Sequence, residues 1–96
     1  MLITIKKMNE TTFKVTVWDQ KTTSHMVTVF PEYWQKLTGG TVSPEKLVEK
    51  SFEFLLEREP NTSILAAFDL PKIQRYLPEY ENTIRTILSD PSPQNR

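Results

Sequence analysis

The chain has 96 residues, of which 38% are hydrophobic and 25% are charged, and this composition is typical of one small globular domain rather than a disordered chain. Twelve basic residues balance twelve acidic ones, so the net charge gives no general attraction for nucleic acid or an anionic membrane. The absence of cysteine excludes disulfides, thiolate metal sites and cysteine nucleophiles.

The first thirty residues predict three β-strands. Apolar and polar residues alternate over 3–6, 13–18 and 25–30, and a period of two is typical of strands with one buried face. Short polar segments at 9–12 and 19–22 separate them, which favours antiparallel neighbours. We therefore expect a three-stranded meander with one apolar face that other elements must cover.

The remainder predicts helices, three of which begin at a proline followed by glutamate: Pro31, Pro44 and Pro78. Proline suits the first helical turn because it lacks an N–H that would find no partner there, and the glutamate complements the helix dipole. The first helix spans 31–37. The last one presents Tyr80, Ile84, Ile87 and Leu88 on one side.

The helix predicted for 44–58 is the central element, with Ser43 as its cap and Pro60 as its stop. Its apolar face is broad enough to pack on the sheet and on later helices. A short helix carrying Ile64, Leu65 and Phe68 follows, and then a turn with Ile73 and Tyr76 inward. These patterns predict one α+β domain over 1–88, with an N-terminal three-stranded antiparallel meander packed on C-terminal helices, and a disordered tail over 89–96.

The second half of the chain resembles a group of small bacterial proteins of uncharacterised function that share a comparable motif. The residues that carry the resemblance are SFEFLLEREPNTSIL, from Ser51, and FDLPKIQRYLPEYE, from Phe68. No activity, cofactor or partner is associated with that group, so the resemblance assigns no functional residue. A weaker likeness, of SHMVTVFPEY followed by two helices, is to ribbon-helix-helix DNA-binding proteins. The outward side chains, Met26 and Thr28, include no Arg, Lys, Asn or Gln, which are the types that make bidentate base contacts.

Two clusters are candidates for function. Arg58 and Glu59 lie at the end of the central helix, where they predict a structural ion-pair junction with Arg75 as a further partner; the alternative is a recognition pair for a charged group. The second cluster is the outer face of the sheet, with Lys14, Trp18, Met26 and Thr28. Such a face predicts a partner or a second copy of the chain, unless the helix at 31–37 folds over it with Tyr33 and Trp34.

Catalytic and metal chemistry find little support in the sequence. His25 is the only histidine, whereas zinc takes three or four ligands such as His and Cys. The serines lack a nucleophile motif, and the spacing of the acidic residues defines no carboxylate pair. We predict no cofactor and no enzymatic activity.

The main functional hypothesis is a cytoplasmic, non-enzymatic domain that works by protein–protein contact or self-association, with no membrane association and no evident small-molecule ligand. No apolar run approaches the roughly 20 residues of a membrane helix, and the N-terminus lacks the pattern of a secretory signal. The alternative is a nucleic-acid-binding regulator of the ribbon-helix-helix kind. An enzyme that uses acidic residues near 60–78 is a third hypothesis.

Overall fold

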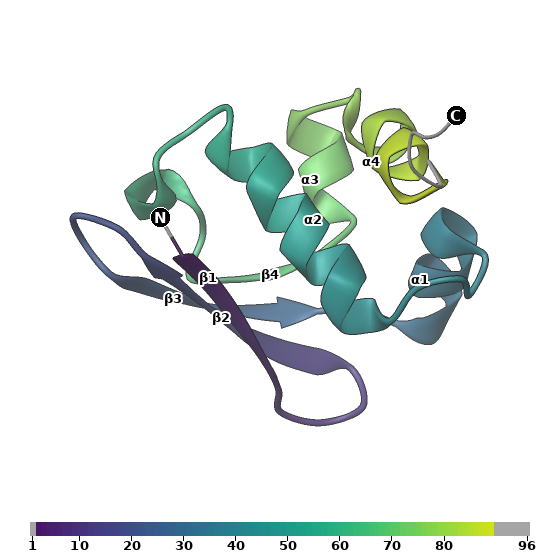
Figure 1. Ribbon diagram of the computed structural model, residues 1–96, viewed down its shortest axis with the longest axis horizontal. Coiled ribbons are helices and arrows are strands. Elements are labelled where there is room, and N and C mark those ends of the chain that lie inside the picture. Colours follow the sequence, from purple (N-terminus) through teal and green to yellow (C-terminus); the bar gives the residue numbers. More distant parts are fainter. Residues whose placement is uncertain (1, 90–96) are drawn as a thin grey trace, which may run out of the picture.

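A computed structural model of the protein describes residues 2–89 (Figure 1). Four strands and four α-helices follow one another with one 3-10 turn: β1 (Leu2–Lys7), β2 (Thr12–Trp18), β3 (Thr23–Thr28), α1 (Pro31–Thr38), α2 (Pro44–Leu56), η1 (Asn61–Ser63), β4 (Ala67–Asp69), α3 (Lys72–Tyr76) and α4 (Tyr80–Ser89). The α+β class is confirmed. The predicted tail lies outside the described residues except for Ser89, which closes α4.

The sheet has the order β1-β2-β3-β4. β1, β2 and β3 form the predicted antiparallel meander, in which Ile5 faces Val15 and Val15 faces His25. β4 is a fourth strand, parallel to β3, in a segment where helix was predicted. The prediction was wrong there because β3 offers a free edge: Met26 N–H donates to Ala66 O at 2.8 Å, and Leu70 N–H donates to Thr28 O at 3.0 Å. Those bonds hold the chain extended.

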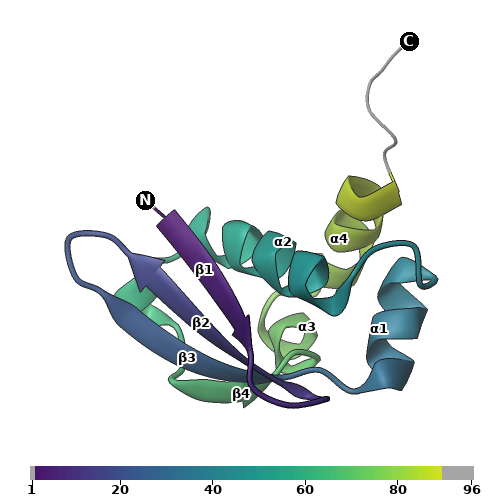
Figure 2. The same cartoon turned by 60° about the horizontal axis from the view of Figure 1, so that its bottom comes forward.

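All helices lie on one side of the sheet (Figures 1 and 2). Alternate residues of β2 and β3 point to that side and are buried, as a period of two requires. α2 crosses this face and supplies most of the opposing surface. The resulting core contains Phe13, Val15, Val17, Val27, Val29, Leu47, Val48, Phe52, Phe54, Leu55, Leu70, Ile73, Tyr80 and Ile84.

The ends of the helices follow from local sequence. Ser43 Oγ accepts the Lys46 N–H at 3.1 Å at the start of α2, while Pro44 occupies the first turn. α1 ends at Gly39, whose φ of 65° is the left-handed conformation that favours glycine. Both ends agree with the sequence prediction.

The outer face of the sheet is not covered by α1. Tyr33 donates from Oη to Glu81 Oε2 at 2.8 Å, and Trp34 donates from Nε1 to Val42 O at 2.8 Å. Both aromatic rings pack against the core, because α1 lies beside α4 and α2. The alternative in which these two residues fold over the outer face is therefore wrong.

Two other side chains predicted to face inward are exposed. Tyr76 is 68% exposed and Ile87 is 42% exposed, although Ile73, Tyr80 and Ile84 on the same elements are buried. α3 has five residues, and its last side chain projects beyond the core because the chain turns away at Leu77. The helical spacing identified the right segments but could not place the limits of the core.

A buried hydroxyl pair joins α2 to α4. Ser51 Oγ donates to Leu47 O at 2.7 Å, so the Tyr80 hydroxyl is the donor in its 2.6 Å bond to Ser51 Oγ. Burial raises the pKa of Tyr80. Burial and the hydrogen bond to Glu81 also raise the pKa of Tyr33.

His25 is part of a buried polar network that ties β3 to the chain before β4. Its Nδ1 lies 2.7 Å from Leu65 O, and because a carbonyl only accepts, Nδ1 carries the proton. Nε2 then accepts from the Thr23 hydroxyl at 2.8 Å. Asn61 Nδ2 donates to Thr23 Oγ1 at 2.9 Å and to Lys21 O at 2.7 Å. The only histidine thus has a structural role.

We expect Asn61→Ala to lower the free energy of unfolding by about 1–3 kcal/mol, because it leaves the Lys21 carbonyl and the Thr23 hydroxyl without a buried donor. Urea denaturation of the variant measures this. Asn82→Ala is the control, because Asn82 is exposed on α4. An equal loss in both variants would contradict the role of the network.

Candidate functional site

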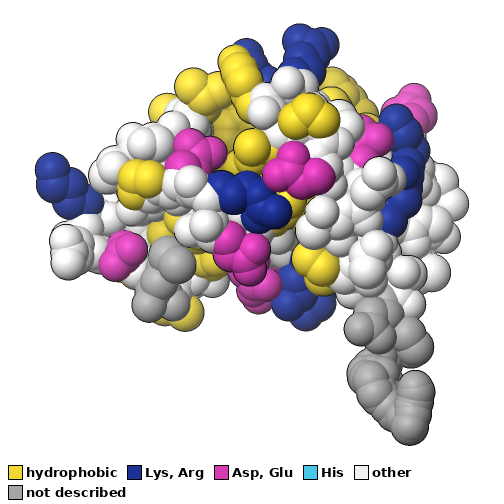
Figure 3. All heavy atoms as spheres, turned by 90° about the horizontal axis from the view of Figure 1, so that it is seen from above, with side chains coloured by type: hydrophobic (Ala, Val, Ile, Leu, Met, Phe, Trp, Pro, Cys, Tyr) yellow, Lys and Arg dark blue, Asp and Glu magenta, His cyan; other side chains and the backbone are white. Residues whose placement is uncertain are grey.

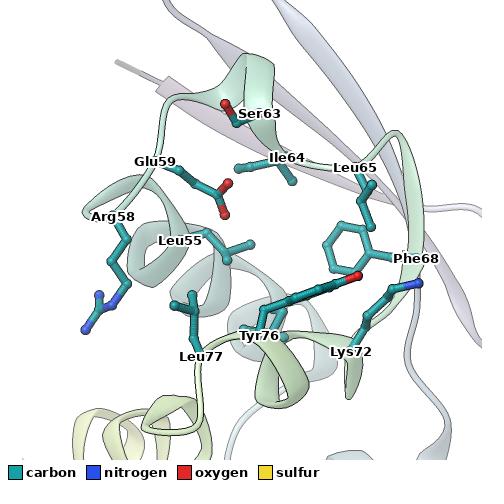
Figure 4. A pocket seen from close by; sticks show the side chains of 11 residues that line it. Leu55, Arg58, Glu59, Ser63, Ile64, Leu65, Phe68, Lys72, Tyr76 and Leu77 are labelled. Carbon is teal, nitrogen blue, oxygen red and sulfur yellow. The ribbon is translucent and has the colours of Figure 1, made fainter.

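An apolar groove of about 430 Å³ lies beside the end of α2. We call it the junction groove. Figure 4 shows its side chains, and Figure 3 shows hydrophobic side chains reaching the surface among acidic and basic ones. The groove is lined by Leu55, Arg58, Glu59, Ser63, Ile64, Leu65, Phe68, Lys72, Ile73, Tyr76 and Leu77.

The groove exists because two prolines interrupt helical structure on either side of it. Pro60 ends the turn after α2, and η1 then leads into the extended chain of β4. Pro71 begins the turn into α3, which runs back beside the end of α2. The apolar side chains of these segments meet at the floor, while their polar side chains stand at the rim (Figure 4).

Arg58 closes one end of the junction and points away from the groove (Figure 4). Its guanidinium carbon lies 3.6 Å from the centre of the Phe54 ring, and Nη1 donates to Phe54 O at 2.9 Å. Its ion-pair partners are Glu79, at 3.2 Å, and Glu57, at 3.3 Å. The Glu79 carboxylate accepts its own backbone N–H and the Arg58 side chain, and these bonds lower its pKa. Arg58 therefore has a structural role.

The predicted ion-pair partners at this junction, Arg58 with Glu59 and Glu59 with Arg75, need correction. Within residues 2–89, neither Glu59 nor Arg75 forms an ion pair, and Arg75 is exposed on α3. Glu79 takes the expected place because the Pro78 turn brings it back to the end of α2, a contact 21 residues apart in the chain. Helix projection alone cannot find such a partner.

Glu59 is the distinctive polar group of the junction groove. It is partly buried, and Figure 4 shows its carboxylate pointing into the groove, across from Lys72 and Tyr76. In the described part of the chain, this carboxylate makes no hydrogen bond and no ion pair. A cationic group that enters the groove can pair with this carboxylate.

The outer face of the sheet is the second candidate surface. Trp18 is 49% exposed and Met26 is 38% exposed, while Trp18 Nε1 donates to Thr4 Oγ1 at 3.3 Å. Lys14 lies between Lys6 and Met26 in the register, and Thr28 lies near the β4 edge. The predicted surface residues thus share one uncovered face.

The ribbon-helix-helix arrangement does not fit this sheet. In those proteins the reading strand pairs with the same strand of a second subunit, so it needs a free edge. β3 lies between β2 and β4 and is bonded on both sides. Lys6 and Lys14 face each other without a carboxylate partner among the described residues, but they form a pair rather than a basic stripe.

No family model, curated protein or solved structure matches this chain. The resemblance of the second half to small bacterial proteins therefore stays a prediction. Over residues 2–89, no three His, Cys, Asp or Glu side chains lie close enough to hold a metal ion together. No helix in the same range is long and apolar enough to cross a membrane.

Sequence reasoning found Arg58 and Glu59 but missed most of the junction groove. Ile64, Leu65 and Phe68 were assigned to a helix face that packs inward, yet Leu65 is 48% exposed at the rim. No sign in the sequence places Lys72 in the groove, because nothing around it distinguishes it from the other lysines. The available clue was the density of prolines between 60 and 78, which excludes a continuous helix over this segment.

Proposed function

We propose that this protein is a non-enzymatic interaction domain, and that its junction groove binds an apolar segment of a partner protein with a lysine or arginine beside the apolar side chain. The observation that carries this proposal is the Glu59 carboxylate, which has no partner within residues 2–89 and points into an apolar groove. An apolar side chain of the partner fills the floor, and the basic residue meets Glu59.

The rim of the junction groove favours a protein segment. A volume of about 430 Å³ accommodates one or two large side chains. Apolar surface also continues past the groove, because Leu65 and Tyr76 are 48% and 68% exposed at its rim. Exposed tyrosine and other large apolar side chains are common at protein interfaces, where they surround a central pocket.

The proposal can be tested by selecting peptides from a random display library on the wild-type domain. We expect enriched peptides to share an aromatic or large aliphatic residue next to lysine or arginine. On Glu59→Lys, the same selection should lose that basic preference, because the carboxylate becomes a cation at the groove. Peptides without the apolar residue, or an unchanged preference on the variant, would contradict the proposal.

Glu53→Lys is the matched control. Glu53 lies on α2, the helix whose end borders the junction groove. Its side chain is exposed and pairs with Lys50 at 3.2 Å. This variant makes the same charge change away from the junction groove. It should select the same peptides as the wild type, so any general effect of net charge would appear in both variants.

A further inference from the structure

β1 is an open edge of the sheet, and the hydrogen-bond pattern shows which of its backbone groups are free. Met8 N–H donates to Thr12 O at 2.8 Å, and residues of β1 and β2 pair so that Lys6 faces Lys14 and Thr4 faces Thr16. In an antiparallel ladder, bonded pairs alternate along the strand. The backbone groups of Leu2, Thr4 and Lys6 therefore bond to β2.

The remaining backbone groups of β1 point away from the sheet. They belong to Ile3, Ile5 and Lys7, and no backbone group in residues 2–89 bonds to them outside the β1–β2 ladder. At the opposite edge, β4 has only three residues. β1 has six residues, and an edge strand of that length with one free side is a template for another strand.

We propose that a second copy of this chain pairs its β1 antiparallel with β1, with Ile5 on the two-fold axis, so that two sheets join into one. Ile5 then exchanges both backbone hydrogen bonds with Ile5 of the second copy, and Ile3 does so with Lys7. Leu2 comes to face Met8 across the new strand pair, and Thr4 comes to face Lys6. The pairs away from the axis (Ile3–Lys7, Leu2–Met8 and Thr4–Lys6) each occur twice, and the Ile5 pair on the axis occurs once.

Self-complementarity favours a second copy over an unrelated strand. Leu2 begins β1 and is 59% exposed, and Met8 directly follows β1 and is 47% exposed. Only a reversed copy of the same strand brings each of them against the other. Trp18, the β2 neighbour of Leu2, extends the apolar row and is 49% exposed. The same register avoids setting Lys6 directly opposite Lys6.

This inference does not depend on the proposed function. β1 contributes nothing to the junction groove, so a dimer would display two grooves. Some repulsion between lysines remains in this dimer. The Lys6 side chains of the two copies lie diagonally across from each other, and within each copy Lys6 is paired with Lys14. Salt should therefore strengthen the dimer by screening this repulsion. Binding of nucleic acid to the same lysines would instead weaken with salt.

Cysteine cross-linking tests the register, because the chain has no cysteine of its own. T4C and K6C are made as separate variants, one with a size tag, and are oxidised alone and mixed. We expect a covalent dimer only in the mixture, because residues 4 and 6 face each other about 4.5 Å apart between Cα atoms. In a dimer of two T4C chains, the two residues at position 4 lie diagonally across from each other, about 7–8 Å apart. The two residues at position 6 in a dimer of K6C chains do the same.

The other outcomes overturn the proposal in distinguishable ways. A covalent dimer from T4C alone, as abundant as that from the mixture, would place Thr4 on the axis instead of Ile5. No cross-link in any sample, together with a monomer in sedimentation velocity of the wild type at high concentration, would exclude the β1 dimer. Peptide selection by the junction groove is unaffected in either case.

Lys7→Pro supplies a second test that leaves the monomer folded. Lys7 is exposed and its N–H points to the free edge, where proline is tolerated. The variant loses two hydrogen bonds of the proposed dimer, so we expect it to sediment as a monomer at concentrations where the wild type is dimeric. Its circular dichroism should match the wild type, and a variant that still dimerises would overturn the proposal.

Discussion

Phe52→Ala is expected to lower the free energy of unfolding by about 3–5 kcal/mol, which is a large share of the total for a domain of this size. Phe52 is fully buried on α2, and its ring centre lies 5.4 Å from that of His25 and 6.1 Å from that of Phe68. It is therefore the contact through which α2 holds both β3 and β4. Urea denaturation measures the loss.

Two further variants show whether packing is the cause. Phe52→Leu keeps most of the volume and should cost less than Phe52→Ala. Glu53→Ala, at the next position, removes an exposed ion pair with Lys50 and should change the free energy of unfolding by under about 1 kcal/mol. Phe52→Ala should also weaken peptide binding, because Phe68 lines the junction groove. A Phe52→Ala protein as stable as the wild type would contradict this account of the core.

Above pH 10 we expect the protein to lose stability steeply. Burial raises the pKa values of Tyr80 and Tyr33 in the folded state, with the Glu81 hydrogen bond adding to the rise at Tyr33. In the unfolded chain these phenols ionise near their ordinary pKa of about 10, so the unfolded state releases protons first. The free energy of unfolding is therefore unaffected below pH 10 and falls above it, by about 1.4 kcal/mol per pH unit for Tyr80. Tyr33 is less buried and contributes less.

Tyrosine variants isolate this effect from the ionisation of lysines. Tyr80→Phe should flatten the decline between pH 10 and 11.5, while costing about 1 kcal/mol at pH 7 because Ser51 loses a hydrogen-bond donor. Tyr33→Phe should flatten it by a smaller amount. Tyr76→Phe is the control, because Tyr76 is 68% exposed. Urea midpoints that decline equally in all four proteins would contradict the prediction.

The parts of the fold that the sequence predicted correctly are those determined by neighbouring residues. Phe13, Val15 and Val17 alternate with polar residues, so a strand over this segment places all three on one face. The structure buries all three. The cap at Ser43 and the stop at Gly39 likewise depend on residues within one helical turn. Periodicity and capping depend only on residues that are close together in the chain, so they can be recognised from the sequence.

The parts that were missed depend on distant partners. Ala67, Phe68 and Asp69 become a strand because β3 has a free edge, which the three residues themselves do not reveal. Arg58 meets Glu79 only after the chain has turned at Pro78. The exposure of Tyr76 depends on where α3 stops. The junction groove combines all three features, so it could not be found without the tertiary structure.

The parallel pairing of β4 also bears on when the junction groove forms during folding. The meander pairs strands that are neighbours in the chain, whereas the hydrogen bond from His25 to Leu65 spans 40 residues. Long-range pairs of this kind close later than local ones, because more chain must be ordered first. Most of the groove is built from residues that follow Pro60. A chain that ends before Pro60 would thus lack most of the groove, so the groove forms only in the last stage of folding.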